Sequence, residues 1–251
     1  MKEDNKKRLE VKRANRSLYN KIKGDYEKID GRRSEELFSW LRDRLSVLSG
    51  SLPQASALLD IGCGSGFVIR AARGLFAAIY GIDISEGILR SMDAGADGLI
   101  CADADSIPLK DGSVDMVILF STMHHLYDAR SVLKEITRVL RKGGVLYIDH
   151  DMEKGFVRRF SLLVRLYRLF SRKEEKYINA GIKRETYELS EFRSEGIDKK
   201  ELEESIKGAG LDIIESYVHW FGLSSITNRI FGRRKYPLSF APLLNVVARK
   251  D

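Results

Sequence analysis

One short segment, residues 57–66, constrains the fold of this chain more than any other. It reads ALLDIGCGSG, a largely apolar run followed by glycines at positions 62, 64 and 66. The apolar run is typical of a buried strand, and glycines at a strand end let the backbone approach a ligand where a Cβ atom would clash. A strand that runs into such a turn and then into a helix is a general cradle for nucleotides, although the same turn also occurs without a ligand.

Short apolar runs alternate with helical patterns beyond this segment. The runs predict strands at 57–61, 77–82, 98–102, 114–120 and 145–150, and the stretches between them predict helices at 66–74, 85–92 and 129–140. This alternation is the signature of a doubly wound, mostly parallel α/β sheet. A helix at 198–208 and strands at 211–220 and 243–249 follow. No helix is expected between these last two strands, which favours an antiparallel pair at one edge.

Three carboxylates, Asp60, Asp83 and Asp103, fall at the carboxyl ends of the first three predicted strands. Ligands of open α/β sheets bind at that edge. Asp83 lies 21 residues beyond Gly62, a distance that suits an acceptor for both ribose hydroxyls of an adenosine. Its alternatives are a helix N-cap and a solvated loop acid. Asp103 is a candidate acceptor for an adenine amino group, with the backbone amide of Ala104 beside the ring, and its alternative is a surface turn acid.

The glycine spacing and the acid before it distinguish between ligands. Gly62, Gly64 and Gly66 form Gly-x-Gly-x-Gly, whereas the dinucleotide fingerprint is Gly-x-Gly-x-x-Gly. The carboxylate of Asp60 would have no favourable electrostatic interaction with a doubly negative pyrophosphate. It suits S-adenosylmethionine, which has no phosphate and carries a positive sulfonium and a positive amino group. The alternative for Asp60 is a cap for backbone amides of the loop.

Five segments resemble the motifs of the class I S-adenosylmethionine-dependent methyltransferases. They are LLDIGCGSG (58–66), GIDIS (81–85), DADSIPL (103–109), DGSVD (111–115) and LKEITRVLRKGG (133–144). Their style is that of the ubiquinone and menaquinone biosynthesis methyltransferases, over residues 57–150, about two fifths of the chain. Ala102 stands where a glycine is usual, and Arg141-Lys142-Gly143-Gly144 where Lys-Pro-Gly-Gly is usual. Neither departure touches the cofactor chemistry.

The resemblance implies a Rossmann-like, seven-stranded sheet whose last strand is antiparallel. It also implies S-adenosylmethionine as cofactor, with S-adenosylhomocysteine as product. In this family the segment before the core often folds over the cofactor, and the loop after the fourth strand borders both cofactor and acceptor. The expected cofactor-binding residues are therefore Asp60, Gly62, Cys63, Gly64, Gly66, Asp83, Ile84, Asp103, Ala104, Phe120, Tyr19 and Tyr26.

The acceptor is expected beyond the fourth and fifth strands. The segment FSTMHH at 120–125 lacks the Asn/Asp-Pro-Pro-aromatic sequence of many methyltransferases that act on nucleobase or glutamine amino groups. His125, with its neighbour His124, and His150 are the candidate catalytic bases, needed only if the acceptor must lose a proton. The alternatives are packing against the sheet for the first two, and a helix cap or a satisfied loop pair with Asp151 for His150. We expect a small-molecule acceptor, lipid-like or anionic.

The chain divides into a helical N-terminal extension at 1–50 and a methyltransferase domain at 51–251, with a helical lid insertion at 152–196. Apolar and basic residues in this insertion recur at helical spacing on two different faces, which predicts one amphipathic basic helix. The apolar residues are Phe156, Phe160, Leu163, Tyr167 and Phe170, and the basic ones are Arg158, Arg165, Arg168 and Arg172. We expect a lid over the acceptor pocket. The alternative is shallow docking of 154–173 on anionic membrane head groups.

Composition narrows the remaining choices. The net charge is +7, but no separate RNA-binding module is visible, so nucleic acid is not expected as a partner. No run of about 18 apolar residues occurs, and the charged first sixteen residues do not resemble a secretory signal. Cys63 and Cys101 are expected to be reduced thiols of a cytoplasmic protein, and no metal site is expected.

Two competing functions stay open at this point. One is an NAD(P)-dependent oxidoreductase on a similar fold, and the other is a cofactor-binding regulatory or partner protein without transferase activity. The oligomeric state is not predicted.

Overall fold

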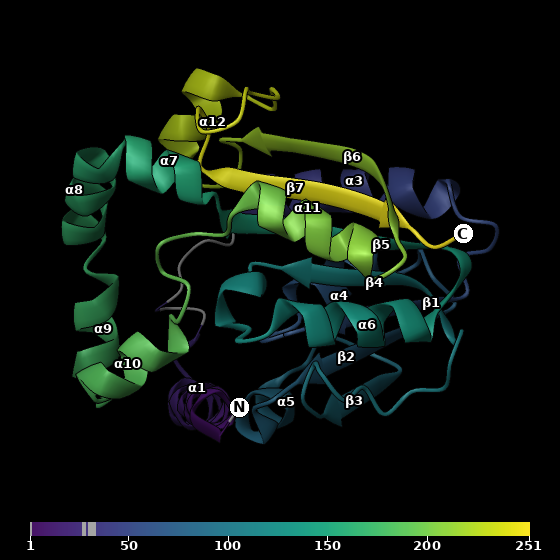
Figure 1. Cartoon of the computed structure of the whole chain (residues 1–251), viewed down its shortest axis with the longest axis horizontal. Coiled ribbons are helices and arrows are strands. Elements are labelled where there is room, and N and C mark those ends of the chain that lie inside the picture. The colour runs from purple at the N-terminus through teal and green to yellow at the C-terminus, as the bar shows by residue number, and fades with distance from the viewer. Residues whose placement is uncertain (1, 27–28, 30–33) are drawn as a thin grey trace.

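The computed structural model describes residues 2–26, 29 and 34–251, and these contain one seven-stranded sheet of order β3-β2-β1-β4-β5-β7-β6 (Figure 1). β7 runs antiparallel to both of its neighbours, and the other pairs are parallel. The strands are β1 (Ala57–Ile61), β2 (Ala78–Asp83), β3 (Gly98–Cys101), β4 (Val114–Phe120), β5 (Leu140–Met152), β6 (Asp212–His219) and β7 (Leu243–Arg249). The predicted α/β class and the antiparallel last strand are confirmed.

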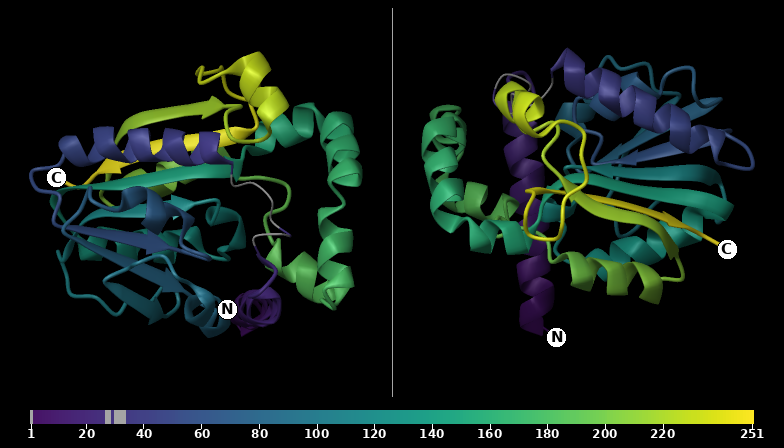
Figure 2. Two further views of the ribbon diagram at one scale, coloured as in Figure 1. Left: turned by 180° about the vertical axis from the view of Figure 1, so that it is seen from behind. Right: turned by 90° about the horizontal axis from the view of Figure 1, so that it is seen from above.

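Helices cover both faces of the sheet because its central strands, β1 and β4, are apolar and buried on both sides. On one face pack α3 (Glu35–Gly50) and α4 (Phe67–Ala72), with Leu41 and Leu45 of α3 fully buried. On the other pack α6 (Ala129–Val139) and α11 (Lys199–Gly208), through Ile136 and Ile206. Figure 2 shows α3 on the side of the sheet opposite to α6 and α11.

A helical arm, residues 154–190, follows β5 and crosses beyond the carboxyl ends of the parallel strands (Figure 1). It consists of α7 (Lys154–Arg159), α8 (Ser161–Ser171), α9 (Lys173–Asn179) and α10 (Arg184–Ser190). The end of the arm meets α1 (Lys2–Ile22), where Leu18 and Ile22 form a buried cluster with Tyr177 and Ile182. In the described part of the chain, none of the helices combines the length and apolarity that a membrane crossing requires.

The arm differs from the single amphipathic helix predicted over 156–170. The helix breaks at Phe160, whose backbone (φ −110°, ψ 37°) ends α7 and begins α8. α7 is fixed separately, because Glu153 caps it and Phe156 is buried against Trp220. The side chain of Phe170 lies outside the described residues.

Two further sequence predictions are corrected. A short helix, α12 (Ser225–Phe231), lies between β6 and β7, although none was expected there. Only seven residues long, it begins with a capping box at Ser224 and Thr227. β5 begins directly after α6, five residues before the predicted strand at 145–150, so Gly143 lies inside the strand. Gly143 has a φ of +77°, and the pairing of β4 with β5 shifts register between Val114 and Met116. Both features mark an irregularity that the apolar pattern does not reveal.

Two helices begin with side-chain caps. The Ser85 hydroxyl accepts a hydrogen bond from the Ile88 amide at the start of α5 (Glu86–Ser91), and the Asp198 carboxylate accepts two backbone N–H groups at the start of α11. The first cap bears on the site, because Ser85 follows the acid at the end of β2.

Candidate functional site

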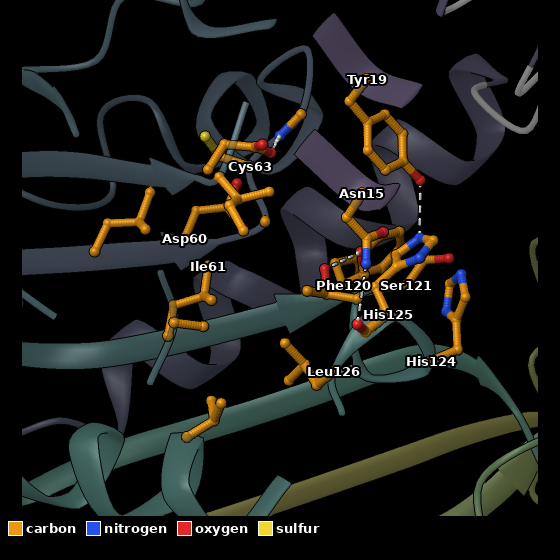
Figure 3. A pocket seen from close by; sticks show the side chains of 18 of the residues that line it. Asn15, Tyr19, Asp60, Ile61, Cys63, Phe120, Ser121, His124, His125 and Leu126 are labelled. Carbon is orange, nitrogen blue, oxygen red and sulfur yellow. Dashed lines mark hydrogen bonds between the residues drawn. The ribbon is translucent and has the colours of Figure 1, made fainter. Parts of the chain in front are cut away.

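A pocket opens at the carboxyl ends of β1, β2 and β4, where the strand order reverses between β1 and β4. Such a reversal point is where open α/β sheets bind ligands. Figure 3 shows side chains from the glycine loop, from the segment after β4 and from α1 around this pocket. Of the residues that the sequence singled out, the lining includes Tyr19, Tyr26, Asp60, Gly62, Cys63, Gly64, Asp83, Ile84, Asp103, Ala104, Phe120, His124, His125 and His150.

The glycine loop requires glycine at two positions for backbone and packing reasons. Gly62 has a φ of +71°, and a Cβ atom there would lie 2.5 Å from Cγ2 of Thr122. Gly66 has a φ of +81°, and its Cβ would lie 2.3 Å from Cβ of Ala94. Gly66 is not among the residues that line the pocket, so its contribution is to the turn rather than to the pocket wall. The ring of Tyr26 lies over the loop beside Gly64.

Asp83 ties the glycine loop to the end of β2. Its Oδ2 accepts a hydrogen bond from the Gly64 amide (3.1 Å), and its Oδ1 accepts one from the Ser85 amide (2.9 Å). Burial raises the pKa of Asp83. Ser85 provides the side-chain cap of α5, so Asp83 is not itself the capping side chain. Each carboxylate oxygen has a further lone pair, and this pair of acceptors matches the two hydroxyls of a ribose.

Asp60 and Cys63 form the wall of the pocket behind the loop. Asp60 is buried at the end of β1. Burial raises the pKa of the Cys63 thiol well above its ordinary value, and the nearby carboxylates of Asp60 and Asp83 raise it further. The thiol therefore stays neutral, and the local field is negative. A cationic ligand group suits such a field better than a phosphate does.

α1 closes the pocket beside Asp103 and Asp105. Nζ of Lys12 lies 2.7 Å from Asp103 Oδ2 and also bonds Asp105, which is paired with Arg8 as well. Ala104 between them is nearly buried and lines the pocket. Asp103 is therefore an ion-paired acid at the pocket rim rather than a freely solvated turn acid.

His125 joins three elements around the pocket. Its Nδ1 lies 2.7 Å from the carbonyl oxygen of Ser190 in α10, and its Nε2 lies 2.9 Å from the hydroxyl of Tyr19 in α1 (Figure 3). A carbonyl oxygen only accepts, so we assign the proton to Nδ1, and Nε2 then accepts from Tyr19. Burial lowers the pKa of His125 to about 4, and the neighbouring His124 lowers it further. The imidazole is therefore neutral near pH 7, and both of its nitrogens are engaged.

The depressed pKa of His125 predicts a loss of stability in acid. The neutral ring makes its full contribution to the stability of the fold above its ordinary pKa of about 6.5. This stability is lost as the pH falls towards about 4, at about 1.4 kcal/mol per pH unit. Between about pH 7 and about pH 5, urea unfolding is expected to show a larger loss of stability for the natural chain than for His125→Gln. Equal losses for the two proteins would contradict the assignment.

A buried network surrounds Asp149 near the end of β5. Its two oxygens accept hydrogen bonds from five groups, and neither oxygen is exposed. The donors are the backbone amide and Nδ1 of His150, Nε2 of His219, the amide group of Asn245 and the hydroxyl of Tyr147. Burial raises the pKa of Asp149, but the electrostatic attraction and hydrogen bonds of His219 and His150 outweigh it and hold that pKa far below its usual range.

This network fixes the orientation of His150. Asp149 Oδ1 lies 2.8 Å from Nδ1, which leaves Nε2 as the nitrogen with the lone pair in the neutral ring. The ring stacks on Phe120 with centroids 4.3 Å apart. His150 has a φ of +67°, and a Cβ on Gly222 would lie 2.2 Å from Nε2. The backbone and its neighbours thus hold the imidazole at the pocket wall.

A second imidazole–carboxylate pair lies nearby. Nδ1 of His124 is 2.6 Å from Oδ1 of Asp151, whose carboxylate also accepts the backbone amides of Met123 and His124. Lys173 of α9 lines the pocket beyond this pair and bonds Glu191 at 3.0 Å. Among the described residues, two groups combine metal-ligating side chains: His124 with His125 and Glu191, and Asp149 with His150 and His219. Hydrogen bonds within and around these groups account for their arrangement, and we assign no metal to them.

The comparison with protein families matches residues 59–148 to a methyltransferase domain. The chain is 38% identical over 123 residues to 27-O-demethylrifamycin SV methyltransferase of Amycolatopsis mediterranei (strain S699), covering 45% of this chain and 44% of that protein. It is 28% identical over 218 residues to the demethylmenaquinone methyltransferase of Lactococcus lactis subsp. lactis (strain IL1403), covering 82% of this chain and 84% of the relative. The chain thus spans less than half of the rifamycin relative and most of the menaquinone relative.

Solved structures agree on the fold. A Thermotoga maritima protein, described as a SAM-dependent methyltransferase and a possible histamine N-methyltransferase, superposes with a TM-score of 0.63 at 20% identity. The match covers 94% of this chain and 99% of that one, so nearly the whole architecture is shared.

Proposed function

The chain contains a class I S-adenosylmethionine-dependent methyltransferase domain, and on this premise we propose that it transfers a methyl group from S-adenosylmethionine to a small-molecule acceptor. The observation that carries the proposal is the pocket itself, in which Asp60, Asp83 and Asp103 lie at the carboxyl ends of three adjacent strands. Three acids around one pocket favour a cationic nucleoside over a pyrophosphate, which argues against the oxidoreductase alternative.

The residues divide along the pocket according to the parts of such a nucleoside. Asp83 is proposed to accept the ribose hydroxyls, and Asp103 with Ala104 to bind the adenine. Asp60 and the glycine loop would face the cationic methionine end, with Tyr19 and Tyr26 closing over it. S-adenosylmethionine supplies a methyl group already activated by its sulfonium, so positioning of the acceptor provides much of the catalysis.

His150 is the proposed base for an acceptor that must lose a proton. The acceptor atom would attack the methyl carbon with its lone pair, the carbon–sulfur electron pair would pass to sulfur, and the acceptor proton would pass to the imidazole of His150. Asp149 holds the Nδ1–H tautomer that this transfer needs. For His125 we propose a positioning role towards Tyr19, since its two ring nitrogens are already hydrogen bonded.

The proposal predicts a kinetic effect at His150. His150→Gln is expected to lower kcat by about 100-fold or more, because proton removal is lost, while S-adenosylhomocysteine affinity changes less than about threefold. The measurement is S-adenosylhomocysteine release in a panel of hydroxylated and carboxylated small molecules. His124→Gln is the matched variant, since that ring is also paired with a carboxylate. If His150→Gln keeps its activity and His124→Gln loses it, the base is His124 rather than His150.

The same panel tests the proposed activity against its second alternative. Tight S-adenosylhomocysteine binding without methylation of any compound, in the panel or in a cell extract, would favour a regulatory or partner protein that binds the cofactor without transferring its methyl group. Turnover of even one acceptor would support the transferase.

A further inference from the structure

α8 presents large apolar side chains to solvent. Val164 is the only buried side chain among its residues 161–169, whereas Leu162 is 71% exposed and Leu169 is 72% exposed. Leu163, Leu166 and Tyr167 are exposed as well. A fully solvated helix of this length normally carries polar residues instead. This number of exposed apolar residues on one helix therefore indicates an interaction surface.

Three of the exposed leucines share one face of the helix. Leu162, Leu166 and Leu169 are spaced four and three residues apart, which aligns them along one side. Val164 is rotated about 200° from Leu162 and anchors the opposite side to the protein. The described residues of α7 and α8 contribute nothing to the pocket lining, to which the arm supplies Lys173 of α9. The leucine face therefore takes no part in the pocket lining, and closing the pocket does not explain it.

Exposed arginines lie along one side of this leucine face and on the preceding helix. Arg158 and Arg159 of α7, and Arg165, Arg168 and Arg172 in and after α8, are all exposed. Residues 153–176 contain eight Lys or Arg against three Glu. An apolar stripe flanked by cations is complementary to a layer that is negative at its surface and apolar beneath it.

We infer that α8 docks the protein on the surface of an anionic lipid bilayer, with its leucines among the acyl chains and the flanking arginines on the head groups. A second copy of this chain is a poorer occupant, because a two-fold contact through the same face would bring arginine against arginine. The inference is independent of the proposed methyl transfer, since it uses neither the pocket nor the histidines.

Sedimentation with vesicles tests the inference on the full chain. Binding is expected to vesicles of phosphatidylcholine containing roughly one third phosphatidylglycerol, and to be at least about tenfold weaker to phosphatidylcholine alone. Leu162→Glu with Leu166→Glu should reduce the partition coefficient at least about tenfold. The matched control is Ile226→Glu with Ile230→Glu on α12, because those isoleucines are 72% and 65% exposed. It should bind as the natural chain does.

A second variant separates charge from apolar insertion. Arg158→Gln with Arg165→Gln should weaken binding to anionic vesicles and flatten its dependence on salt, because fewer cations face the head groups. S-adenosylhomocysteine binding should be unchanged in every variant, which shows that the fold is intact. The inference is overturned by an absence of binding to anionic vesicles, or by an equal loss of vesicle binding in the α12 control. It is also overturned if light scattering shows a dimer that the leucine variant dissociates and the natural chain does not bind vesicles.

Discussion

Asp83→Ala is expected to weaken S-adenosylhomocysteine binding by at least about 100-fold, the largest loss of affinity from any single substitution in the pocket. Two hydrogen bonds from ribose hydroxyls to a carboxylate contribute about 1.5–3 kcal/mol each, so losing both costs at least two factors of ten. The same substitution removes the acceptor of the Gly64 amide, which loosens the glycine loop. Isothermal titration calorimetry measures the change.

Asp97 provides the matched control for this loss. Its Oδ2 accepts the Ile79 amide at 2.7 Å, near the opposite end of β2, so Asp97→Ala also removes a carboxylate–backbone hydrogen bond. It should lower stability without changing S-adenosylhomocysteine affinity. Unchanged affinity in Asp83→Ala, or equal losses in the two variants, would refute the ribose role.

Asp149→Ala is expected to cause the largest loss of stability. It would leave two imidazoles, an amide group and a phenol without their acceptor in a buried site, at a cost of about 3–5 kcal/mol and roughly 10 °C in Tm. Urea unfolding followed by tryptophan fluorescence suits the measurement, because the Trp40 ring lies 5.5 Å from that of His150. A loss below about 1 kcal/mol would contradict the central role of this carboxylate.

The pH dependence and a control sharpen this prediction. Because the folded pKa of Asp149 is depressed, its contribution to stability is present above the ordinary pKa of 3.8 and is lost only as the pH falls below that value.

Asp115→Ala is the control, since Asp115 is also buried and accepts hydrogen bonds from the Ala57 amide and from Arg141 at the opposite end of the sheet. It should lower stability while leaving S-adenosylhomocysteine affinity and turnover unchanged.

The strands and the acids at their ends were predictable because both are local properties of the sequence. The apolar runs of β1 and β4 stay buried on both faces, and the sequence positions of Asp60 and Asp83 after their strands already imply a shared edge. The antiparallel pairing of β6 and β7 was predicted correctly from a premise that was wrong. The short α12 lies between them, and its exposed isoleucines give no amphipathic signal of a buried face.

The rest of the site depends on contacts between distant parts of the chain. Lys12 meets Asp103 across 91 positions, and Asn245 meets Asp149 across 96. No local pattern encodes such partners. Asp149 did leave one signal that the sequence interpretation missed, a carboxylate within the apolar strand segment VLYID, where a buried charge needs partners.

Calorimetric titration of the natural chain with S-adenosylhomocysteine, and separately with NAD⁺, tests the central claim most directly. One molecule of S-adenosylhomocysteine is expected to bind per chain with a Kd of about 10 μM or lower, and NAD⁺ is expected to give no measurable heat. Tight NAD⁺ binding without binding of S-adenosylhomocysteine would contradict the assignment of this pocket to S-adenosylmethionine.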